Sequence, residues 1–385
     1  MGTVHAIERL NGRTFEFTYV SLAMTRSTIE DEPLPLESSP GFELWTTFSR
    51  QCTKLHLDLR CNKARWVHLF PPFYALTHLE IINPANGVTS TMLARIDRGC
   101  PLISLKVMQL RTTTIIKFGS ILGQLKRLYV STRIQKLFGK LLPLLGNVEE
   151  LSLRIPPILR RRVPLTAFYV PKNTILPNLT TLEAPGSLVG LLPPFVLKRI
   201  TRLTVLRPSI MSLNSGHNEA ENPPLLLPCL VHLTLCGVWE DLLSIDAPNL
   251  HQLVLESNSK VNEYQSKYAL TRLRPSILRM TYLSSFCTVL SVVEDSEDSI
   301  SPFKHVQELH IESFFSSGVD KDLIPALAKP ILPQLKHLVI TTPMNNEDVI
   351  KKWMSKMRMV ADRRAEMGMQ PLITTRFNVR DEKIF

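Results

Sequence analysis

The sequence lacks the segments that insert a chain into a membrane or export it. No apolar run among its 385 residues approaches the ~18–20 residues that cross a bilayer. The first twenty residues, MGTVHAIERLNGRTFEFTYV, contain no hydrophobic core of a signal peptide. We therefore expect a cytoplasmic or nuclear protein that does not contact a membrane.

The sequence is also poor in the patterns that carry catalysis or hold metals. Its 6 cysteines include no C-x-x-C pair and no spacing to histidine typical of a zinc site. It contains no glycine-rich phosphate or dinucleotide loop, no G-x-S-x-G nucleophile turn and no H-E-x-x-H motif. These absences predict reduced thiols, no metal, no cofactor and no enzymatic activity.

What the sequence does contain is a repeat. Twelve segments place apolar residues three and then two positions apart, in the pattern L-x-x-L-x-L. In the tenth segment, ILRMTY, these positions fall on Ile277, Met280 and Tyr282. The twelve segments begin at Cys52, Leu76, Leu102, Leu125, Val148, Leu179, Ile200, Leu230, Leu250, Ile277, Val306 and Leu335.

The distance between successive segments indicates a fold. It runs from 20 residues (230 to 250) to 31 (148 to 179), close to the 20–29 residues of a leucine-rich repeat. The last two apolar positions point to one side of a short strand, and the first packs under the same core from the preceding turn. No repeat buries its apolar face alone, so neighbours stack into one sheet. We predict an α/β leucine-rich-repeat solenoid, a horseshoe with a concave parallel β-sheet of about twelve strands.

Three regions are expected along the chain: an N-terminal cap segment over 1–48, the solenoid over 49–344, and a C-terminal capping helix with a final strand over 345–385. Open ends of a repeat stack need such caps. The capping helix should end near Gly368. Its apolar stripe is expected to consist of Val349, Trp353, Met357 and Val360.

The segments between strands should form a convex side of mixed structure. The periodicity of residues 132–145 and 320–329 predicts helices there. The prolines within 159–172 and 188–198 predict irregular connections instead.

Positive charge is concentrated in the middle of the chain. The net charge is +11 overall, but residues 98–210 hold 18 Lys or Arg against 3 acidic residues, a net of +15 (18 − 3). A basic region of this kind predicts an acidic partner surface or nucleic acid. Aromatic residues make up only 7% of the chain and no stacking motif interleaves the basic residues, which favours a protein partner over nucleic acid.

The repeats resemble those of the F-box/leucine-rich-repeat-like proteins of basidiomycete fungi, with their L-P-x-L-x-x-L-x-L copies of uneven length. The segment SLAMTRSTIEDEPLPLE is similar to the one that follows the F-box in that family, and 359–372 is similar to its closing helix and last strand. The positions that carry the N-terminal likeness are Leu22, Arg26, Ser27, Pro33, Leu34 and Leu36. The resemblance implies a substrate receptor or adaptor of a ubiquitin ligase.

The F-box itself, which docks onto a cullin ligase in that family, would precede Arg26. The residues before Arg26 are strand-like (TFEFTYV), so we expect the chain to lack this element. Leu34-Pro35-Leu36-Glu37 copies an F-box opening, but the Ser38-Ser39-Pro40-Gly41 that follows would break its first helix. A cullin-ligase linker is therefore implied as a partner by the resemblance alone.

The repeat pattern predicts which basic side chains share the concave face. Lys106 and Tyr129 stand between the paired leucines of their strands, Arg127 and Arg202 precede the second leucine, and Arg154 follows its strand. Together they would span roughly 20 Å, about four strand spacings, and would bind a short acidic or phosphorylated peptide. Two alternatives remain: Arg127 pairs with Glu150 on the adjacent strand, or the basic region 98–210 binds nucleic acid.

Overall fold

The computed structural model describes most of the repeat region and the C-terminal helix. The chain divides into two compact units: unit 1 is Met1–Ala184 with Leu191–Val196, and unit 2 is Pro185–Gly190 with Leu197–Phe385. Among the described residues, each unit contains seven consecutive strands of parallel β-sheet. The described residues are 19–24, 49–59, 72–82, 88–96, 99–110, 114–132, 134, 136–155, 169–172, 174–206, 225–236, 245–256, 273–280, 303–312, 327–328, 330, 332–342 and 347–379.

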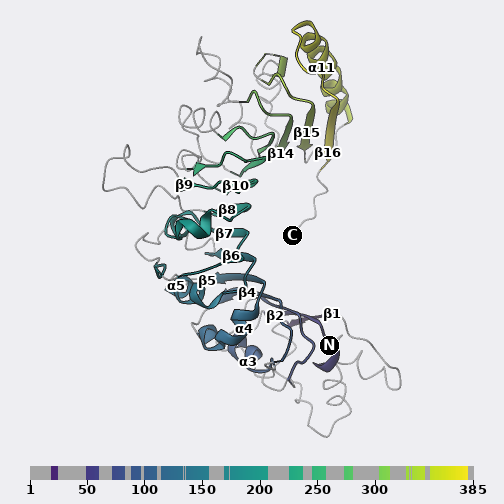
Figure 1. The fold of residues 1–385 in the computed structure, drawn as a ribbon. Coiled ribbons are helices and arrows are strands. Elements are labelled where there is room, and N and C mark those ends of the chain that lie inside the picture. Colours follow the sequence, from purple (N-terminus) through teal and green to yellow (C-terminus); the bar gives the residue numbers. More distant parts are fainter. Residues whose placement is uncertain are drawn as a thin grey trace, which may run out of the picture. The chain divides into compact units, whose positions relative to one another are not determined.

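In unit 1 each strand pairs in parallel with the next strand of the sequence (Figure 1). The pairing of consecutive strands is the one that a stack of repeats requires. The strands are β1 Tyr19–Met24, β2 Lys54–Leu59, β3 His78–Ile82, β4 Ser104–Leu110, β5 Arg127–Thr132, β6 Glu150–Arg154 and β7 Thr181–Pro185.

Unit 2 follows the same plan, again with every described pairing parallel. A separate two-stranded ladder joins β9 Leu225–Leu226 to β11 Ile245–Asp246. The main strands are β8 Arg202–Leu206, β10 His232–Cys236, β12 Gln252–Leu255, β13 Ile277–Met280, β14 Glu308–Glu312, β15 His337–Thr342 and β16 Thr374–Val379. The prediction of a parallel sheet built from consecutive repeat strands is therefore confirmed.

The described helices are short, apart from the last. Figure 1 shows α3, α4 and α5 on one side of the strands of unit 1. Among the helices that the structure describes, none is both long and apolar enough to cross a bilayer. Their bounds are α3 Val88–Ala94, the 3-10 helix η3 Thr114–Phe118, α4 Gly119–Gln124, α5 Lys136–Leu141, the 3-10 helix η4 Leu142–Leu144, α6 Gly186–Val189, α7 Pro194–Leu197 and α11 Glu347–Glu366.

Two predictions about the connections have clear outcomes. The helix predicted over 132–145 is confirmed by α5 and η4. The irregular structure predicted over 188–198 is wrong, because single helical turns, α6 and α7, occupy parts of this segment. Pro194 is the first residue of α7, a position where the missing N–H has no helical partner to lose. Most of 320–329 and residues 159–168 lie outside the described residues.

The apolar columns explain the repeat spacing. In eleven of the twelve segments the three predicted apolar residues are at most 5% exposed. The ladders align the second and third positions of neighbouring strands, so each unit buries two continuous columns on one face of its sheet. In unit 1 the longer column contains Leu55, Leu79, Leu105, Leu128, Leu151 and Leu182.

The predicted positions of the tenth segment are wrong, because they do not match the register of β13 with β12. Ile277 does not begin the repeat: Leu278 and Met280 fill the second and third positions, aligned with Leu253 and Leu255 of β12. Both are buried, and the first position is taken by Pro275, which is also buried. The L-x-x-L-x-L pattern misses this repeat because its first residue is a proline.

A backbone carbonyl in the turn before most of the described strands accepts two amides from the next repeat and fixes the register. The carbonyl of Thr53, one residue after the first apolar position, accepts bonds from the amides of Thr77 and His78 at 2.8 and 3.0 Å. The same two-amide arrangement recurs in both units. Its other acceptors are the carbonyls of Thr77, Ile103, Lys126, Glu149, Thr201, Val231, His251, Ser276 and Gln307.

Side-chain amides add a second ladder along the same turns. In unit 1 Gln124 donates to the carbonyl of Cys100 at 3.1 Å, and Asn147 donates to that of Gly123 at 2.7 Å. Each donor immediately precedes the first apolar residue of its repeat. In unit 2 Asn249 makes the equivalent bond to Pro228 at 2.7 Å. These amides give the turn carbonyls a side-chain donor, and the carbonyl of Cys100 also accepts the amide of Leu102 at 2.9 Å.

The C-terminal helix α11 is anchored by a buried arginine. Met357 and Val360 are buried as predicted, whereas the side chains of Val349 and Trp353 lie outside the described residues. Arg364 continues the same stripe, four residues after Val360, and is 0% exposed. Its guanidinium donates to the carbonyls of Leu327 (3.1 Å), Leu332 (2.9 Å), Leu335 (3.3 Å) and Gln370 (3.1 and 3.2 Å).

Replacing Arg364 should therefore destabilise the chain. Arg364→Met keeps the bulk of the side chain but removes the guanidinium donors from these carbonyls, of which that of Leu332 keeps the amide of Leu335 at 3.2 Å. We expect a loss of about 2 to 4 kcal/mol in the free energy of unfolding. Chemical denaturation measures the loss. Arg363→Met, at the exposed neighbouring position, should change stability by less than about 0.5 kcal/mol. Equal effects of the two variants would remove the anchoring role.

A second packing constraint lies at Gly139 in α5. A Cβ at this position would stand 2.1 Å from the carbonyl oxygen of Tyr169, so the helix and the 169–172 segment approach too closely for any larger residue. Gly146, by contrast, has nothing within 4 Å of the place that a Cβ would occupy. The two glycines form a matched pair for substitution.

Gly139→Ala should lower stability although alanine favours helix by about 1 kcal/mol over glycine. The displaced backbone should outweigh that gain, with a net loss of roughly 1 to 3 kcal/mol. Thermal unfolding compares this variant with Gly146→Ala, which should match or slightly exceed the wild type. A stabilised Gly139→Ala protein would show that the 169–172 segment does not pack on α5.

Candidate functional site

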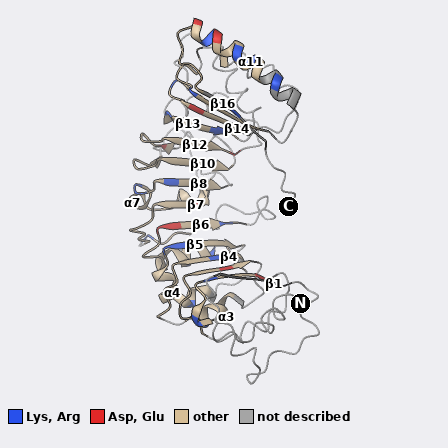
Figure 2. Cartoon of the chain, turned by 90° about the vertical axis from the view of Figure 1, so that its right-hand side faces the viewer, with Lys and Arg blue, Asp and Glu red and all other residues tan. Residues whose placement is uncertain are grey.

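The face of each sheet opposite the buried leucine columns carries mainly polar side chains, and we call it the open face. In unit 1 its central row consists of the residues between the paired apolar positions, aligned strand by strand. Figure 2 colours the charged residues along these strands. The row runs through His56, Glu80, Lys106, Tyr129, Ser152 and Glu183.

Glu80 is the first of two carboxylates that organise this row. One of its oxygens lies 2.5 Å from Lys106 Nζ and the other 2.9 Å from His56 Nδ1. Partial burial raises the pKa of Glu80, but the hydrogen bonds from Lys106 and His56 outweigh it and hold that pKa below its usual value. Lys106 remains 43% exposed, so one side of its ammonium group stays accessible.

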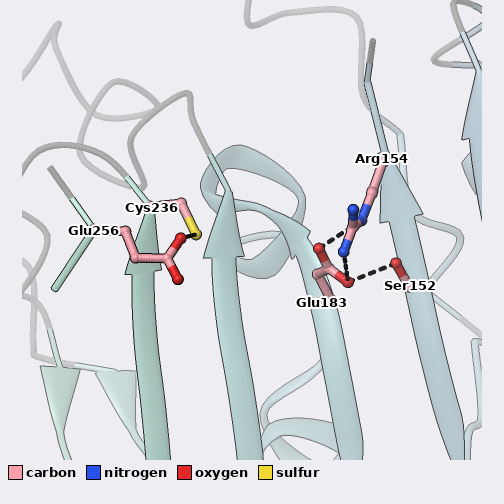
Figure 3. Close-up of polar contacts among 5 residues, drawn as sticks. All are labelled: Ser152, Arg154, Glu183, Cys236 and Glu256. Atoms are coloured by element: carbon pink, nitrogen blue, oxygen red, sulfur yellow. Dashed lines mark hydrogen bonds and ion pairs between the residues drawn. The ribbon is translucent and has the colours of Figure 1, made fainter. Parts of the chain in front are cut away.

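Glu183 is the second organising carboxylate (Figure 3). Arg154 binds it with two nitrogens, Nε at 2.6 Å and Nη2 at 2.9 Å, and Ser152 donates its hydroxyl at 2.8 Å. The two-nitrogen contact fixes the plane of the guanidinium. The Glu183 side chain is 16% exposed and that of Arg154 is 53% exposed, so the acid is mostly buried and the base is partly exposed to solvent.

Arg127 takes part in a chain of hydrogen bonds that crosses three strands. Its Nη2 lies 2.8 Å from His78 Nε2, and His78 Nδ1 lies 2.8 Å from the hydroxyl of Thr77. Thr77 in turn donates to the carbonyl of Thr53 at 2.8 Å. Because the Thr77 proton is committed to Thr53, the geometry assigns the proton of neutral His78 to Nδ1 and makes Nε2 the acceptor from Arg127.

Tyr129 completes the set by donating its hydroxyl to Glu150 at 2.9 Å. Partial burial raises the pKa of Tyr129, and the bond to Glu150 raises it further. The register places Arg127 directly beside Glu150, but the contacts of these two side chains run to His78 and to Tyr129. Arg127 and Glu150 are therefore neighbours on adjacent strands, as the repeat pattern predicts, but their described side-chain contacts are with His78 and Tyr129.

The predicted site residues divide between the two units. Lys106, Arg127, Tyr129 and Arg154 all lie on the open face of unit 1, and each contacts another side chain of that face. Arg202 begins β8 of unit 2. Their role in binding a partner stays a prediction.

The open face of unit 2 has a different charge pattern. Its described side-chain contacts include His232 with Gln252 at 3.0 Å, His310 with Glu308, and the Cys236 thiol donating to Glu256 at 3.1 Å (Figure 3). Arg202, Arg279 and Arg376 are exposed. Among the residues that the structure describes, these three arginines have no ion pair or side-chain hydrogen bond.

Arg279 and Arg376 were not among the predicted site residues, because the prediction rested on the high net positive charge of residues 98–210. The density of bases along the chain says nothing about which of them already contact an acid. The strand position of Arg279 was in the repeat pattern, but the out-of-register tenth segment hid it. Within the described part of the chain, no three His, Cys, Asp or Glu side chains gather into a set that could hold a metal ion.

The His78 chain of hydrogen bonds predicts a pH dependence of stability. Burial, followed by the charges of Arg127 and Lys54, lowers the pKa of His78 from its ordinary 6.5. As pH falls through 6.5 the unfolded chain takes up a proton that the folded chain resists, so acidification favours unfolding. The contribution of neutral His78 is complete above 6.5 and declines below it.

His78→Gln keeps an amide donor and an oxygen acceptor but does not titrate. The free energy of unfolding of the wild type should fall more steeply than that of this variant between about pH 7 and pH 5. Urea denaturation at a series of pH values measures both slopes. Parallel slopes would show that His78 is not held neutral by the folded chain.

Comparison with known proteins adds no family to these observations. A scan against protein-family models finds no match to the chain, and a search of curated proteins finds none either. Over the described residues, the architecture is an α/β arrangement with a large, all-parallel sheet of consecutive strands and few helices. Any function must therefore be argued from the open faces of that sheet.

Proposed function

We propose that this chain is a leucine-rich-repeat solenoid that serves as a non-enzymatic scaffold and binds an acidic or phosphorylated protein on its concave, open face. The observation that carries the proposal is the separation of the two faces of the sheet. The leucine columns are buried on one face, and cross-strand pairs hold polar, partly exposed side chains on the other. A rigid polar face of this kind binds with little loss of side-chain freedom.

The paired bases keep donors for an incoming anion. A guanidinium has five N–H donors, and Arg154 directs only Nε and one Nη toward Glu183. Lys106 likewise has three N–H donors and is 43% exposed. A carboxylate or phosphate of a partner would meet bases whose positions are already fixed, which favours specific recognition.

A sequence resemblance suggests the cellular process in which such a scaffold would act. The resemblance to F-box/leucine-rich-repeat-like proteins of basidiomycete fungi implies a substrate receptor or adaptor of a ubiquitin ligase. In that role the open face would hold the protein to be modified. The cullin-ligase linker enters the proposal through this resemblance.

The test begins with identification of the partner by affinity purification of the full chain and ends with purified components. Because Lys106 and Arg154 each contact a carboxylate, glutamine is substituted to avoid placing like charges together. Lys106→Gln, Arg154→Gln and Arg202→Gln combined should weaken binding of the identified protein at least about tenfold, or roughly 1.4 kcal/mol, with an unchanged melting temperature.

The matched control removes three exposed bases from helices and turns outside the strands: Lys136→Gln, Lys140→Gln and Lys198→Gln. This control should bind like the wild type. Equal binding by both triple variants would reject the open face. Submicromolar binding of RNA or DNA with a steep dependence on salt would instead support the nucleic-acid alternative, which the low aromatic content of the chain, 7%, makes the weaker of the two proposals.

A further inference from the structure

Arg279 and Arg376 lie in one row of the open face of unit 2. The register aligns Arg279 of β13 with His310 of β14, His310 with Val339 of β15, and Val339 with Arg376 of β16. Both arginines are exposed, and Figure 2 labels the strands β13, β14 and β16 that carry the row's polar members. Three strand spacings separate the arginines, about 14 Å.

The two arginines differ from the paired bases of unit 1. Arg154 is held by Glu183 and Lys106 by Glu80, so an anion that binds there shares the base with a carboxylate. Within the described residues, Arg279 and Arg376 have no such competitor in contact. Two nearby acids whose side chains are described have partners of their own, since Glu308 contacts His310 and Glu256 accepts the Cys236 thiol.

We infer that this row binds an extended peptide segment of the partner that carries two phosphorylated side chains four residues apart. An extended chain advances about 3.3–3.6 Å per residue, so four residues cover the ~14 Å between the two arginines. An exposed guanidinium gains little from a single carboxylate. A phosphate has about twice the charge and three acceptor oxygens, which suit the two-pronged donors of arginine.

This inference rests on the proposed function, because it names the chemistry of the segment that a protein partner would offer. It assigns the segment to residues outside the Lys106, Arg154 and Arg202 set. The two ideas therefore fail independently. A partner can lose binding through the first set while the peptide still binds the row, and the converse also holds.

The experiment measures fluorescence anisotropy of a labelled nine-residue peptide of glycine, alanine and serine with phosphoserines at its third and seventh positions. The full-length wild type should bind it at least about tenfold more tightly than Arg279→Gln/Arg376→Gln, as expected for the loss of two charge-assisted contacts. A peptide with phosphoserines two residues apart should bind the wild type more weakly, because it reaches only one arginine at a time.

Three control proteins accompany the double variant. Arg358→Gln/Arg363→Gln removes two exposed arginines from α11 of the same unit and should bind the peptide like the wild type. Arg202 lies on the open face of unit 2 at the strand position just before the second apolar residue, outside the row of Arg279 and Arg376. The Arg202→Gln protein should also bind the peptide like the wild type. The Lys106→Gln/Arg154→Gln/Arg202→Gln protein should retain peptide binding whatever it does to the partner.

Four results would overturn the inference. Two concern the variants: unchanged peptide binding by Arg279→Gln/Arg376→Gln, or a loss of affinity with Arg202→Gln as large as that of the double variant. Two concern the ligand: equally tight binding of a peptide with glutamates at the two positions, or tighter binding of an RNA oligonucleotide than of the peptide. The melting temperatures of all variants, measured alongside, separate lost binding from lost folding.

Discussion

The structure depends on one recurring interaction, the backbone carbonyl that accepts two amides from the next repeat. Thr53, Lys126 and Val231 each supply such a carbonyl one residue after the first apolar position. Where it occurs, this bond fixes the turn of one repeat against the turn of the next, so that their strands pair in the same register. A slip of one residue would turn each leucine column to the opposite face. Register is therefore the constraint from which the core and the open face both follow.

The polar contacts of the open face are consequences of that register. Glu80 meets Lys106, and Ser152 meets Glu183, because the ladder places them side by side on adjacent strands. Half burial strengthens such bonds relative to fully exposed ion pairs, since fewer waters compete for the charged atoms. The same geometry leaves the outer side of Lys106 and Arg154 in solvent, and a binding face needs this combination of fixed position and free donors.

The C-terminal helix meets a different requirement. The turn before β15 presents several backbone carbonyls toward α11, and Arg364 supplies donors to those of Leu327, Leu332 and Leu335 at once. A guanidinium suits this place because its five donors form a planar fork and because it stays protonated even though burial lowers its pKa. The helix thus contributes a charged side chain to the interior of unit 2, where a purely apolar stripe would leave backbone oxygens unsatisfied.

The positions of most repeat strands could be predicted from the residue order alone, because the L-x-x-L-x-L spacing is a local pattern that recurs often enough to be recognised. The same pattern placed Lys106, Arg127, Tyr129 and Arg154 on one face for the same reason. The contacts that these residues make depend on the folded arrangement, since Arg127 and His78 are 49 residues apart and Arg154 and Glu183 are 29 apart. The folded arrangement also placed Pro275 at the start of the tenth repeat, where the pattern had predicted Ile277, and buried Arg364 in the interior. The physical reason is that strand position follows from local periodicity, whereas burial and pairing follow from the register between distant strands.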